Sequence, residues 1–160
     1  MDENGQIVSA DAPNGVFTVS VDEKGRLKLP AAMLAYLESF KDDRKVFITT
    51  FDESEARLYP ISLWRETVKK LQASGDDSEA LADLALIADH YGKEVEVDVQ
   101  GRLTLPELLR KAMRLEKDEA RMRSYQGKIL LFNGADYEKN LAEAKKGLAE
   151  KLKVGKRIAL

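Results

Sequence analysis

The chain has 160 residues, 44% hydrophobic and 34% charged, which suits one globular domain or two small fused ones, and its lack of cysteine excludes disulfides, thiolate metal sites and cysteine nucleophiles. Its formal charge of −2 is unevenly distributed, because residues 1–91 carry 10 Lys and Arg against 17 Asp and Glu, whereas residues 92–160 carry 16 against 11. Local basic faces, rather than the net charge, therefore decide whether the chain can bind phosphates.

The N-terminal segment, residues 1–14, is acidic and rich in small residues. It has neither the basic start nor the apolar core of a secretory signal, so we expect a mobile arm. No later stretch approaches the length of a membrane-spanning helix, and we expect no membrane partner. With the absence of cysteine, this favours a cytoplasmic protein.

A ten-residue string occurs twice in the chain. It reads VDEKGRLKLP at residues 21–30 and VDVQGRLTLP at residues 97–106, a shift of 76 residues from Asp22 to Asp98. Alternating apolar residues precede and follow each Gly-Arg, which indicates two short half-buried strands, and the closing proline suits the first turn of a helix. Each copy is therefore predicted to form strand, tight turn, strand and helix.

Each copy continues in the same way beyond the motif. The expected helices after the prolines have apolar faces made of Leu34 and Leu37 in the first copy and of Leu108, Leu109, Ala112 and Met113 in the second. Two further strands and a closing helix follow. The closing helices are expected from Ser62 to Leu71, with Trp64, Val68 and Leu71 on one face, and from a cap at Asp136, with Tyr137, Leu141, Ala144 and Leu148.

A helical connector is expected between the copies. Ser78 can cap it, Leu81, Leu84, Ala88 and Tyr91 share one of its faces, and Gly92 ends it. Two strand-rich units with unpaired edges are stabilised by pairing with each other, so we expect one intramolecular pseudo-dimer. The predicted division is an arm at 1–14, a first repeat at 15–75, the connector at 76–91, a second repeat at 92–145 and a basic C-terminal extension at 146–160.

The repeated D-x-x-G-R pattern has a structural and a functional interpretation. The aspartate can accept backbone N–H groups, and glycine supplies the positive φ of a tight hairpin, which accounts for every motif residue except Arg26 and Arg102. Each arginine can close its turn by pairing with its own aspartate or with Glu23. Alternatively, an arginine on a rigid turn can dock bidentately on guanine or phosphate, and both roles can coexist.

The strings DEKGRLKLP, LYPISLW, DVQGRLTLP and LEKD resemble the MraZ family, regulators of the bacterial cell-division and cell-wall gene cluster, over about residues 15–75 and 92–145. The resemblance implies an α+β fold of two tandem AbrB-like (SpoVT-AbrB) repeats that form a swapped-hairpin β barrel with peripheral helices. It also implies a nucleoid-associated repressor that binds direct repeats of double-stranded promoter DNA as a ring-shaped homo-oligomer.

The same resemblance implies which residues contact DNA. The matching positions are Asp22, Lys24 and Arg26 in the first motif and Asp98 and Arg102 in the second. Charge and proximity add Lys28. The second motif has Val99 and Gln100 before its glycine, which predicts a weaker phosphate contact there. The basic C-terminal residues are interpreted as a solvated helix face; they are Lys145, Lys146, Lys151, Lys153, Lys156 and Arg157.

The residues offer little to an enzyme. His90 is the only histidine and is expected at a helix end, no phosphate-binding glycine loop occurs, and Glu94, Glu96 and Asp98 are interpreted as a solvated strand edge. We predict no catalytic residue, metal, cofactor or small-molecule substrate. Trp64 is assigned to the core or a subunit interface. The alternatives to a DNA-binding regulator are an oligomeric interaction scaffold and an AbrB-type antitoxin.

Overall fold

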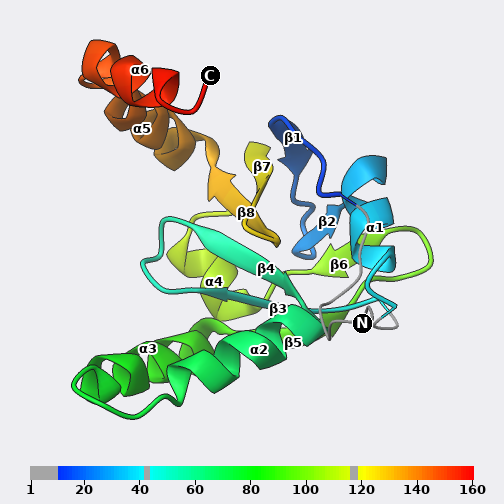
Figure 1. The fold of residues 1–160 in the computed structure, drawn as a ribbon. Coiled ribbons are helices and arrows are strands. Elements are labelled where there is room, and N and C mark those ends of the chain that lie inside the picture. The colour runs from blue at the N-terminus through cyan, green and yellow to red at the C-terminus, as the bar shows by residue number, and fades with distance from the viewer. Residues whose placement is uncertain (1–10, 42–43, 116–118) are drawn as a thin grey trace.

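The computed structural model describes residues 11–41, 44–115 and 119–160. Over these residues the protein has a mixed α+β architecture in which the strands pair antiparallel and the helices lie outside the sheet (Figure 1). The predicted arm at 1–14 lies largely outside the described residues. Among the described residues, no helix has both the length and the apolar character needed to cross a membrane.

The two repeats have the same order of elements. The first contains β1 (Phe17–Ser20), β2 (Arg26–Lys28), α1 (Ala31–Glu38), β3 (Lys45–Thr50), β4 (Ala56–Pro60) and α2 (Ile61–Leu71). The second contains β5 (Lys93–Glu96), β6 (Arg102–Thr104), α4 (Glu107–Ala112), β7 (Glu119–Tyr125), β8 (Lys128–Asn133) and α5 (Gly134–Lys145). Between them lies α3 (Ser78–Tyr91), and α6 (Leu148–Lys156) ends the chain. The predicted order of strand, turn, strand and helix is confirmed in both.

The repeats exchange their first strands. The larger sheet has the order β1-β7-β8-β4-β3-β5, so β1 pairs with the second repeat's hairpin and β5 with the first repeat's hairpin. The two hairpins meet where β4 pairs with β8, and β2 pairs with β6 as a separate two-stranded ribbon. If each strand is replaced by its equivalent in the other repeat, the same order results, read from the opposite edge of the sheet. This symmetry is that of a two-fold pseudo-dimer. The expected pairing of the copies within one chain is confirmed.

The main core is shared by both repeats. The apolar residues of both motifs, both hairpins and both short helices form one buried cluster. Leu27 is 0% exposed and Leu103 2%, and such burial stabilises the fold by about 1.5–3 kcal/mol for each leucine. The two repeats therefore fold as one unit.

A second apolar cluster lies under α2 and α3. Trp64 is stacked on Phe47, with ring centroids 4.2 Å apart and an angle of 11° between the planes, and it also packs against Tyr59. Ala88 of α3 is buried in the same cluster. The assignment of Trp64 to core packing is confirmed. The helix α3 does not only connect the repeats, because its Ala88 completes this cluster.

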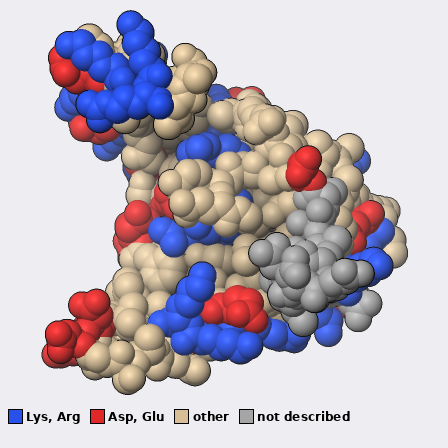
Figure 2. All heavy atoms as spheres, in the orientation of Figure 1, with Lys and Arg blue, Asp and Glu red and all other residues tan. Residues whose placement is uncertain are grey.

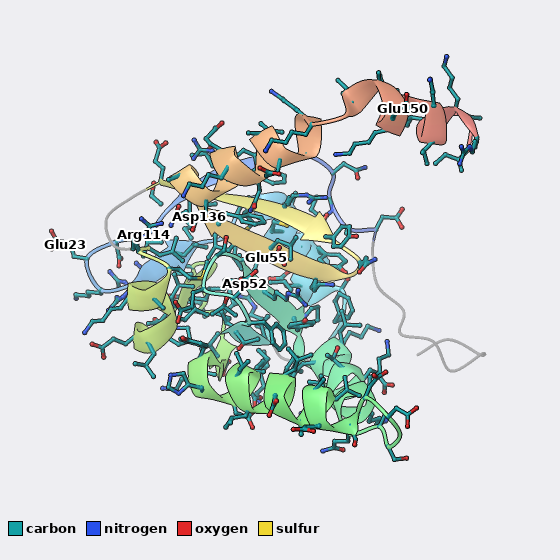
Figure 3. The ribbon with its side chains drawn as sticks, turned by 90° about the vertical axis from the view of Figure 1, so that its left-hand side faces the viewer. Glu23, Asp52, Glu55, Arg114, Asp136 and Glu150 are labelled. Atoms are coloured by element: carbon teal, nitrogen blue, oxygen red, sulfur yellow. The ribbon has the colours of Figure 1, made fainter. Side chains whose placement is uncertain are left out.

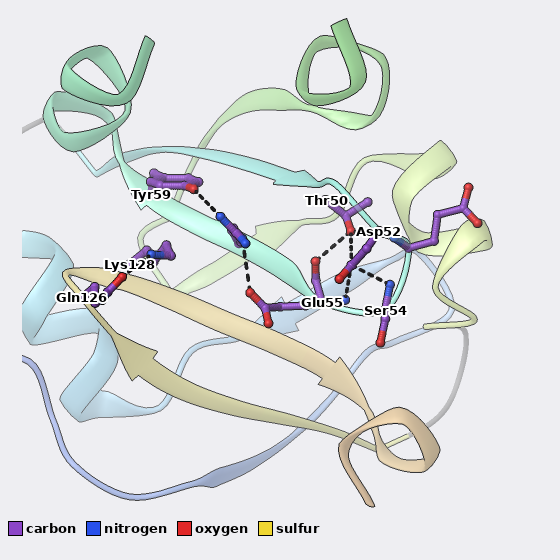
Figure 4. A network of polar contacts seen from close by, with 9 residues as sticks. Thr50, Asp52, Ser54, Glu55, Tyr59, Gln126 and Lys128 are labelled. Carbon is purple, nitrogen blue, oxygen red and sulfur yellow. Dashed lines mark hydrogen bonds and ion pairs between the residues drawn. The ribbon is translucent and has the colours of Figure 1, made fainter. Parts of the chain in front are cut away.

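The β3–β4 turn is held by a polar network (Figure 4). Asp52 Oδ1 accepts hydrogen bonds from the backbone N–H groups of Ser54 (3.0 Å) and Glu55 (2.9 Å). The Thr50 hydroxyl donates to the Glu55 carbonyl (2.7 Å), and Arg57 Nε contacts the Glu55 carboxylate at 3.2 Å. These bonds fix the hairpin whose second strand, β4, joins the two repeats.

Two helix caps differ from the prediction. Asn133, rather than Asp136, caps α5: its side-chain oxygen accepts the backbone N–H of Asp136 at 2.8 Å, while its amide donates to the buried Met113 carbonyl at 2.7 Å. Asn133 is 5% exposed, so the cap also ties α5 to the end of α4. The N-cap position of α3 is Asp77 rather than Ser78.

Two predicted apolar faces also differ. Leu108 is 54% exposed, because α4 has only six residues and buries Leu109 and, just beyond its end, Met113 instead. The predicted long closing helix breaks at Gly147, which has φ of 64°, and Leu148 therefore begins α6 and is 51% exposed. The helix α5 packs on β7 and β8, with Tyr137 against Phe132, whereas α6 extends beyond the sheet (Figures 1 and 3).

Candidate nucleic-acid interface

The β2–β6 ribbon has one apolar and one basic face. In its antiparallel register Arg26 lies opposite Thr104, and Lys28 lies opposite Arg102. The leucine between these residues in each strand is buried in the core. Because side chains alternate along a strand, the four polar residues share the outer face. The ribbon therefore presents three basic side chains on one surface.

The first loop, defined here as residues 22–26, is organised by Asp22. One carboxylate oxygen accepts the backbone N–H groups of Lys24 (2.9 Å) and Arg26 (2.8 Å), and the other accepts Arg26 Nε at 2.8 Å. Gly25 adopts a φ of 78°, which only glycine takes without strain. One aspartate thus holds both the turn and the arginine side chain.

The second loop, residues 98–102, repeats this geometry. Asp98 accepts the N–H groups of Gln100 (2.8 Å) and Arg102 (2.9 Å) with one oxygen and Arg102 Nε (3.2 Å) with the other. Gly101 has a φ of 79°. The turn-closing ion pair predicted for each arginine is confirmed, and its partner is the motif aspartate rather than Glu23, which extends outward from the first loop (Figure 3).

The ion pairs leave the Nη groups of both arginines available to bind a ligand. In both loops the aspartate bonds Nε, and among the described residues the Nη groups of Arg26 and Arg102 meet no acceptor. The bond to Nε fixes the direction of the planar guanidinium group and reduces the conformational entropy that the side chain loses when it binds a ligand. The ion pair and a ligand-binding role are therefore compatible.

Both motif aspartates are held ionised. The backbone N–H of Arg26 lowers the pKa of Asp22 most, followed by other loop bonds that together outweigh desolvation, and the N–H of Arg102 does the same for the pKa of Asp98. A lowered carboxyl pKa means that this stabilisation is present above the ordinary pKa and is lost as the pH falls through the lowered value. At neutral pH both loops are fully formed.

The two loops are also joined to each other. The backbone N–H of Leu29 donates to the Gly101 carbonyl, and that of Leu105 donates to the Gly25 carbonyl, each at 2.9 Å. The loops consequently lie at opposite ends of one short ribbon and cannot move independently. The predicted residues Asp22, Lys24 and Arg26 lie at one end, and Asp98 and Arg102 lie at the other beside Lys28.

The sequence reasoning missed three basic residues near the loops. Arg110 of α4 covers the first loop so closely that a Cβ on Gly25 would lie 1.7 Å from its Nη1 atom. Lys93 of β5 lines the same hollow as Lys24 and Arg110. Arg44 bonds the Asp98 carbonyl (2.8 Å) behind the second loop and is paired with Glu38 at 2.9 Å. Comparing positions 76 residues apart would have singled out Lys93 and Arg110, because their equivalents are Phe17 and Leu34.

His90 lies where it was predicted, in the last turn of α3. Its ring meets the Tyr91 ring edge to face, with centroids 4.7 Å apart. The helix that carries it packs on α2 and β3. Its neighbours give it a role in helix-end packing.

The fold and the ribbon define a binding protein made of two fused, strand-exchanged repeats with a rigid basic surface at their junction. The family model described as "MraZ protein, putative antitoxin-like" matches residues 92–155. A transcriptional regulator MraZ of Koribacter versatilis is 35% identical over 81% of this chain and 87% of its own length, and that of Thiobacillus denitrificans is 32% identical over 81% and 86%. The corresponding regulator of Shewanella piezotolerans is 26% identical over 91% and 96%. The chain belongs to the MraZ family, which is a family of transcriptional regulators and not of enzymes.

Proposed function

We propose that this chain is a sequence-specific, DNA-binding transcriptional regulator that reads DNA with the outer face of the β2–β6 ribbon. The observation that carries the proposal is the pair of loops in which an aspartate fixes the arginine through Nε and leaves the fork facing outward. A two-stranded ribbon fits the major groove of B-DNA, and arginine bidentate to guanine is the commonest specific contact there.

The residues divide into base readers and phosphate contacts. Arg26 and Arg102 are assigned to guanine, and Lys24 and Lys28 to phosphates. One arginine–guanine contact gives only about 1–3 kcal/mol of discrimination. Specific occupation of a promoter therefore requires several subunits that bind together, each raising the effective concentration of the next.

The finer proposal concerns what is regulated. The chain acts as a repressor in the cytoplasm, at the nucleoid, by occupying direct repeats in the promoter of its own cell-division and cell-wall gene cluster. Membership of the MraZ family supports the regulatory role. The operator and the sign of regulation rest on the resemblance of the motifs.

A ring-shaped homo-oligomer is proposed on charge and exposure. Lys and Arg gather over α6, whereas Asp and Glu gather over the turn between α2 and α3 (Figure 2). The α6 segment also exposes several apolar residues: Leu148, Leu152, Val154, Ile158 and Leu160. A contact between these unlike surfaces of neighbouring subunits is head-to-tail, and such contacts close into rings when the rotation allows it.

A closed swapped-hairpin barrel is also part of the proposal. The described strands pair as an open six-stranded sheet and a separate ribbon. A Val21–Leu27 bridge connects the chain after β1 to β2, and after β5 the Asp98 N–H donates to the Arg102 carbonyl of β6 at 2.8 Å. These contacts support the ribbon as the element that closes the barrel between both sheet edges. The division into repeats at 15–75 and 92–145 is proposed on the same equivalence.

An AbrB-type antitoxin is the second candidate, because the description of the matched family includes an antitoxin-like character. The completeness of the duplication favours the regulator. An antitoxin requires a toxin that co-purifies with it, and an interaction scaffold without DNA binding would show no salt-dependent affinity for duplexes. These two properties separate the three functions.

The proposal is tested by fluorescence anisotropy with duplex DNA from upstream of this protein's own gene, across a salt series. Wild type is expected to bind this DNA more tightly than a scrambled duplex, and Arg26→Ala/Arg102→Ala to lose that preference. The control Arg65→Ala/Lys69→Ala removes the same charge from α2 and should bind as wild type does. Equal weak binding by all three proteins to any duplex would reduce the arginines to turn residues.

A further inference from the structure

Two surface hollows flank the ribbon at equivalent positions of the two repeats. One, of about 240 Å³, is lined at its base by Thr104, Leu105 and Pro106. The other, of about 460 Å³, is lined there by Lys28, Leu29 and Pro30, which are 76 residues earlier. Because the repeats exchange strands, the first hollow lies between α4, β5 and the first loop. Its counterpart lies between α1, β1 and the end of β2.

The two hollows differ in charge. Lys24, Lys93 and Arg110 converge on the smaller hollow, and Glu107, the one carboxylate among its described lining residues, is bonded to Lys111 at 2.8 Å. Among the described residues, no carboxylate lies within ion-pair distance of Lys24 or Lys93. The residues equivalent to these three cations are Gln100, Phe17 and Leu34. Among the described residues that line the larger hollow, Lys28 is the one that is charged.

The loop geometry brings these cations to the ribbon. The Arg110 guanidinium lies against the Gly25 backbone, where its counterpart Leu34 approaches Gly101 with a methyl group at 3.1 Å from an ideal Cβ position. The first-loop end of the ribbon thus carries Lys24, Arg26, Lys93 and Arg110. The second-loop end carries Lys28 and Arg102, together with Arg44, which Glu38 already pairs.

We propose that the hollow formed by Lys24, Lys93 and Arg110, named here the basic hollow, holds a backbone phosphate of the DNA with three cations, whereas at the second-loop end Lys28 contacts a phosphate without such a cluster. Three convergent cations in a concave site hold a phosphodiester at fixed distance from the loop that reads the adjacent bases. This inference rests on the proposed function. It adds Lys93 and Arg110 to the binding surface and makes the two ends of the pseudo-dimer unequal.

A phosphate contact has a measurable signature. Each phosphate that a cation neutralises contributes about −0.9 to the slope of log K against log salt, and it carries no base preference. Loss of Lys93 and Arg110 removes the contact to one phosphate, so it should flatten the slope by about 0.9 and weaken the binding of specific and scrambled duplexes by the same factor. Loss of a base-reading arginine changes the ratio between the two duplexes instead.

The test compares Lys93→Gln/Arg110→Leu with wild type by anisotropy across a salt series. Leucine is the residue that the equivalent position carries, and Lys93→Gln alone, on an exposed side chain, provides a variant with no folding risk. Lys69→Gln/Lys70→Gln on α2 is the charge-matched control. The expected result is at least tenfold weaker binding at low salt, a flatter slope and an unchanged specificity ratio in the hollow variants only.

The outcomes separate this inference from the proposed function. An unchanged salt slope in Lys93→Gln/Arg110→Leu, while wild type still binds its promoter specifically, would overturn the basic hollow alone. No specific binding by wild type would overturn the proposed function. A calorimetric titration of wild type with inorganic phosphate distinguishes the source of the anion: tight binding that Lys93→Gln abolishes without any effect on DNA affinity would show a free-phosphate site and overturn the DNA contact.

Discussion

Lys28 of the first repeat lies directly opposite Arg102 of the second in the antiparallel ribbon, so the two cations share the outer face although 74 positions separate them. The equivalent pair at the other end is Arg26 and Thr104, where only one residue is charged. Like charges in directly opposed strand positions destabilise a sheet. Asp98 already pairs with Arg102 at 3.2 Å, so the charge that a negative ligand would compensate is that of Lys28.

Replacing Lys28 with threonine, the residue of the equivalent position, should therefore affect stability and binding in opposite directions. The free energy of unfolding is expected to rise by about 0.3 kcal/mol because a like-charge pair is removed. DNA affinity should fall, with a salt slope flatter by about 1. Denaturant unfolding monitored by the single tryptophan, Trp64, and anisotropy measure the two effects.

The reciprocal change, Thr104→Lys, is the matched control. It places a lysine opposite Arg26 and should strengthen DNA binding while lowering stability slightly. If both variants bind across the salt series as wild type does, Lys28 only borders the interface.

Replacing Asp22 with asparagine separates the turn from the arginine. The amide oxygen can still accept the two backbone N–H groups, but the amide nitrogen is a donor and faces the Nε donor of Arg26. The fold should be retained, whereas promoter affinity falls about tenfold because the fork is no longer held. Nitrogen-15 spectra report the Arg26 Nε resonance, and anisotropy reports binding. Full binding by Asp22→Asn would show that the carboxylate serves the turn alone.

The duplicated motif made much of this fold predictable. Alternation around each Gly-Arg located the four short strands, and Leu27 and Leu103 are buried as that pattern required. Strand exchange was less accessible, since β1 and β5 pair with hairpins of the other repeat and no local pattern identifies the partner. The cap at Asn133 was missed because its side chain serves both α5 and a buried carbonyl of the preceding helix end.

The candidate site was predicted only where it is local in sequence. The motif itself placed Asp22 and Arg26 within one turn, whose hydrogen bonds span at most four residues. Arg110 and Lys93 reach the first loop from the other repeat through strand exchange, so their distance in sequence conceals them. Lys28 was assigned by proximity to its own motif, whereas the antiparallel register carries it to the second loop.

The two loop glycines give a matched pair of variants. Both have φ near 78°, so alanine should cost each loop about 1 kcal/mol of stability through backbone strain. Only at Gly25 does the new methyl group meet the Arg110 guanidinium, the end of a flexible side chain that can move away. Gly25→Ala is therefore expected to weaken DNA binding more than Gly101→Ala at comparable stability. Equal losses in anisotropy would argue against a binding role for Arg110.

Charge reversal tests the proposed subunit contact. Lys151→Glu/Lys156→Glu on α6 should dissociate the oligomer, because it places like charges against the acidic turn that contains Asp76 and Asp77. Adding Asp76→Lys/Asp77→Lys should restore assembly. Size-exclusion chromatography with light scattering measures the mass. A monomeric wild type that binds its promoter fully would contradict the need for multivalency.

The first-loop and second-loop ends of the ribbon differ in charge, which predicts that each subunit binds its promoter box in one orientation only. Because the chain lacks cysteine, Glu23→Cys and Val99→Cys provide single attachment points at equivalent positions of the two loops, and Val99 is 93% exposed. An iron chelate attached at either position generates radicals that cleave nearby DNA.

With the first-loop end anchored by the basic hollow, the chelate at position 23 should cut one side of every promoter box and the chelate at position 99 the other side, in the same order along the promoter. Direct repeats require such an order, since a symmetric reader would match an inverted repeat instead. Mirror-symmetric cleavage, identical for both labels, would mean that the two ends are equivalent on DNA despite their difference in charge.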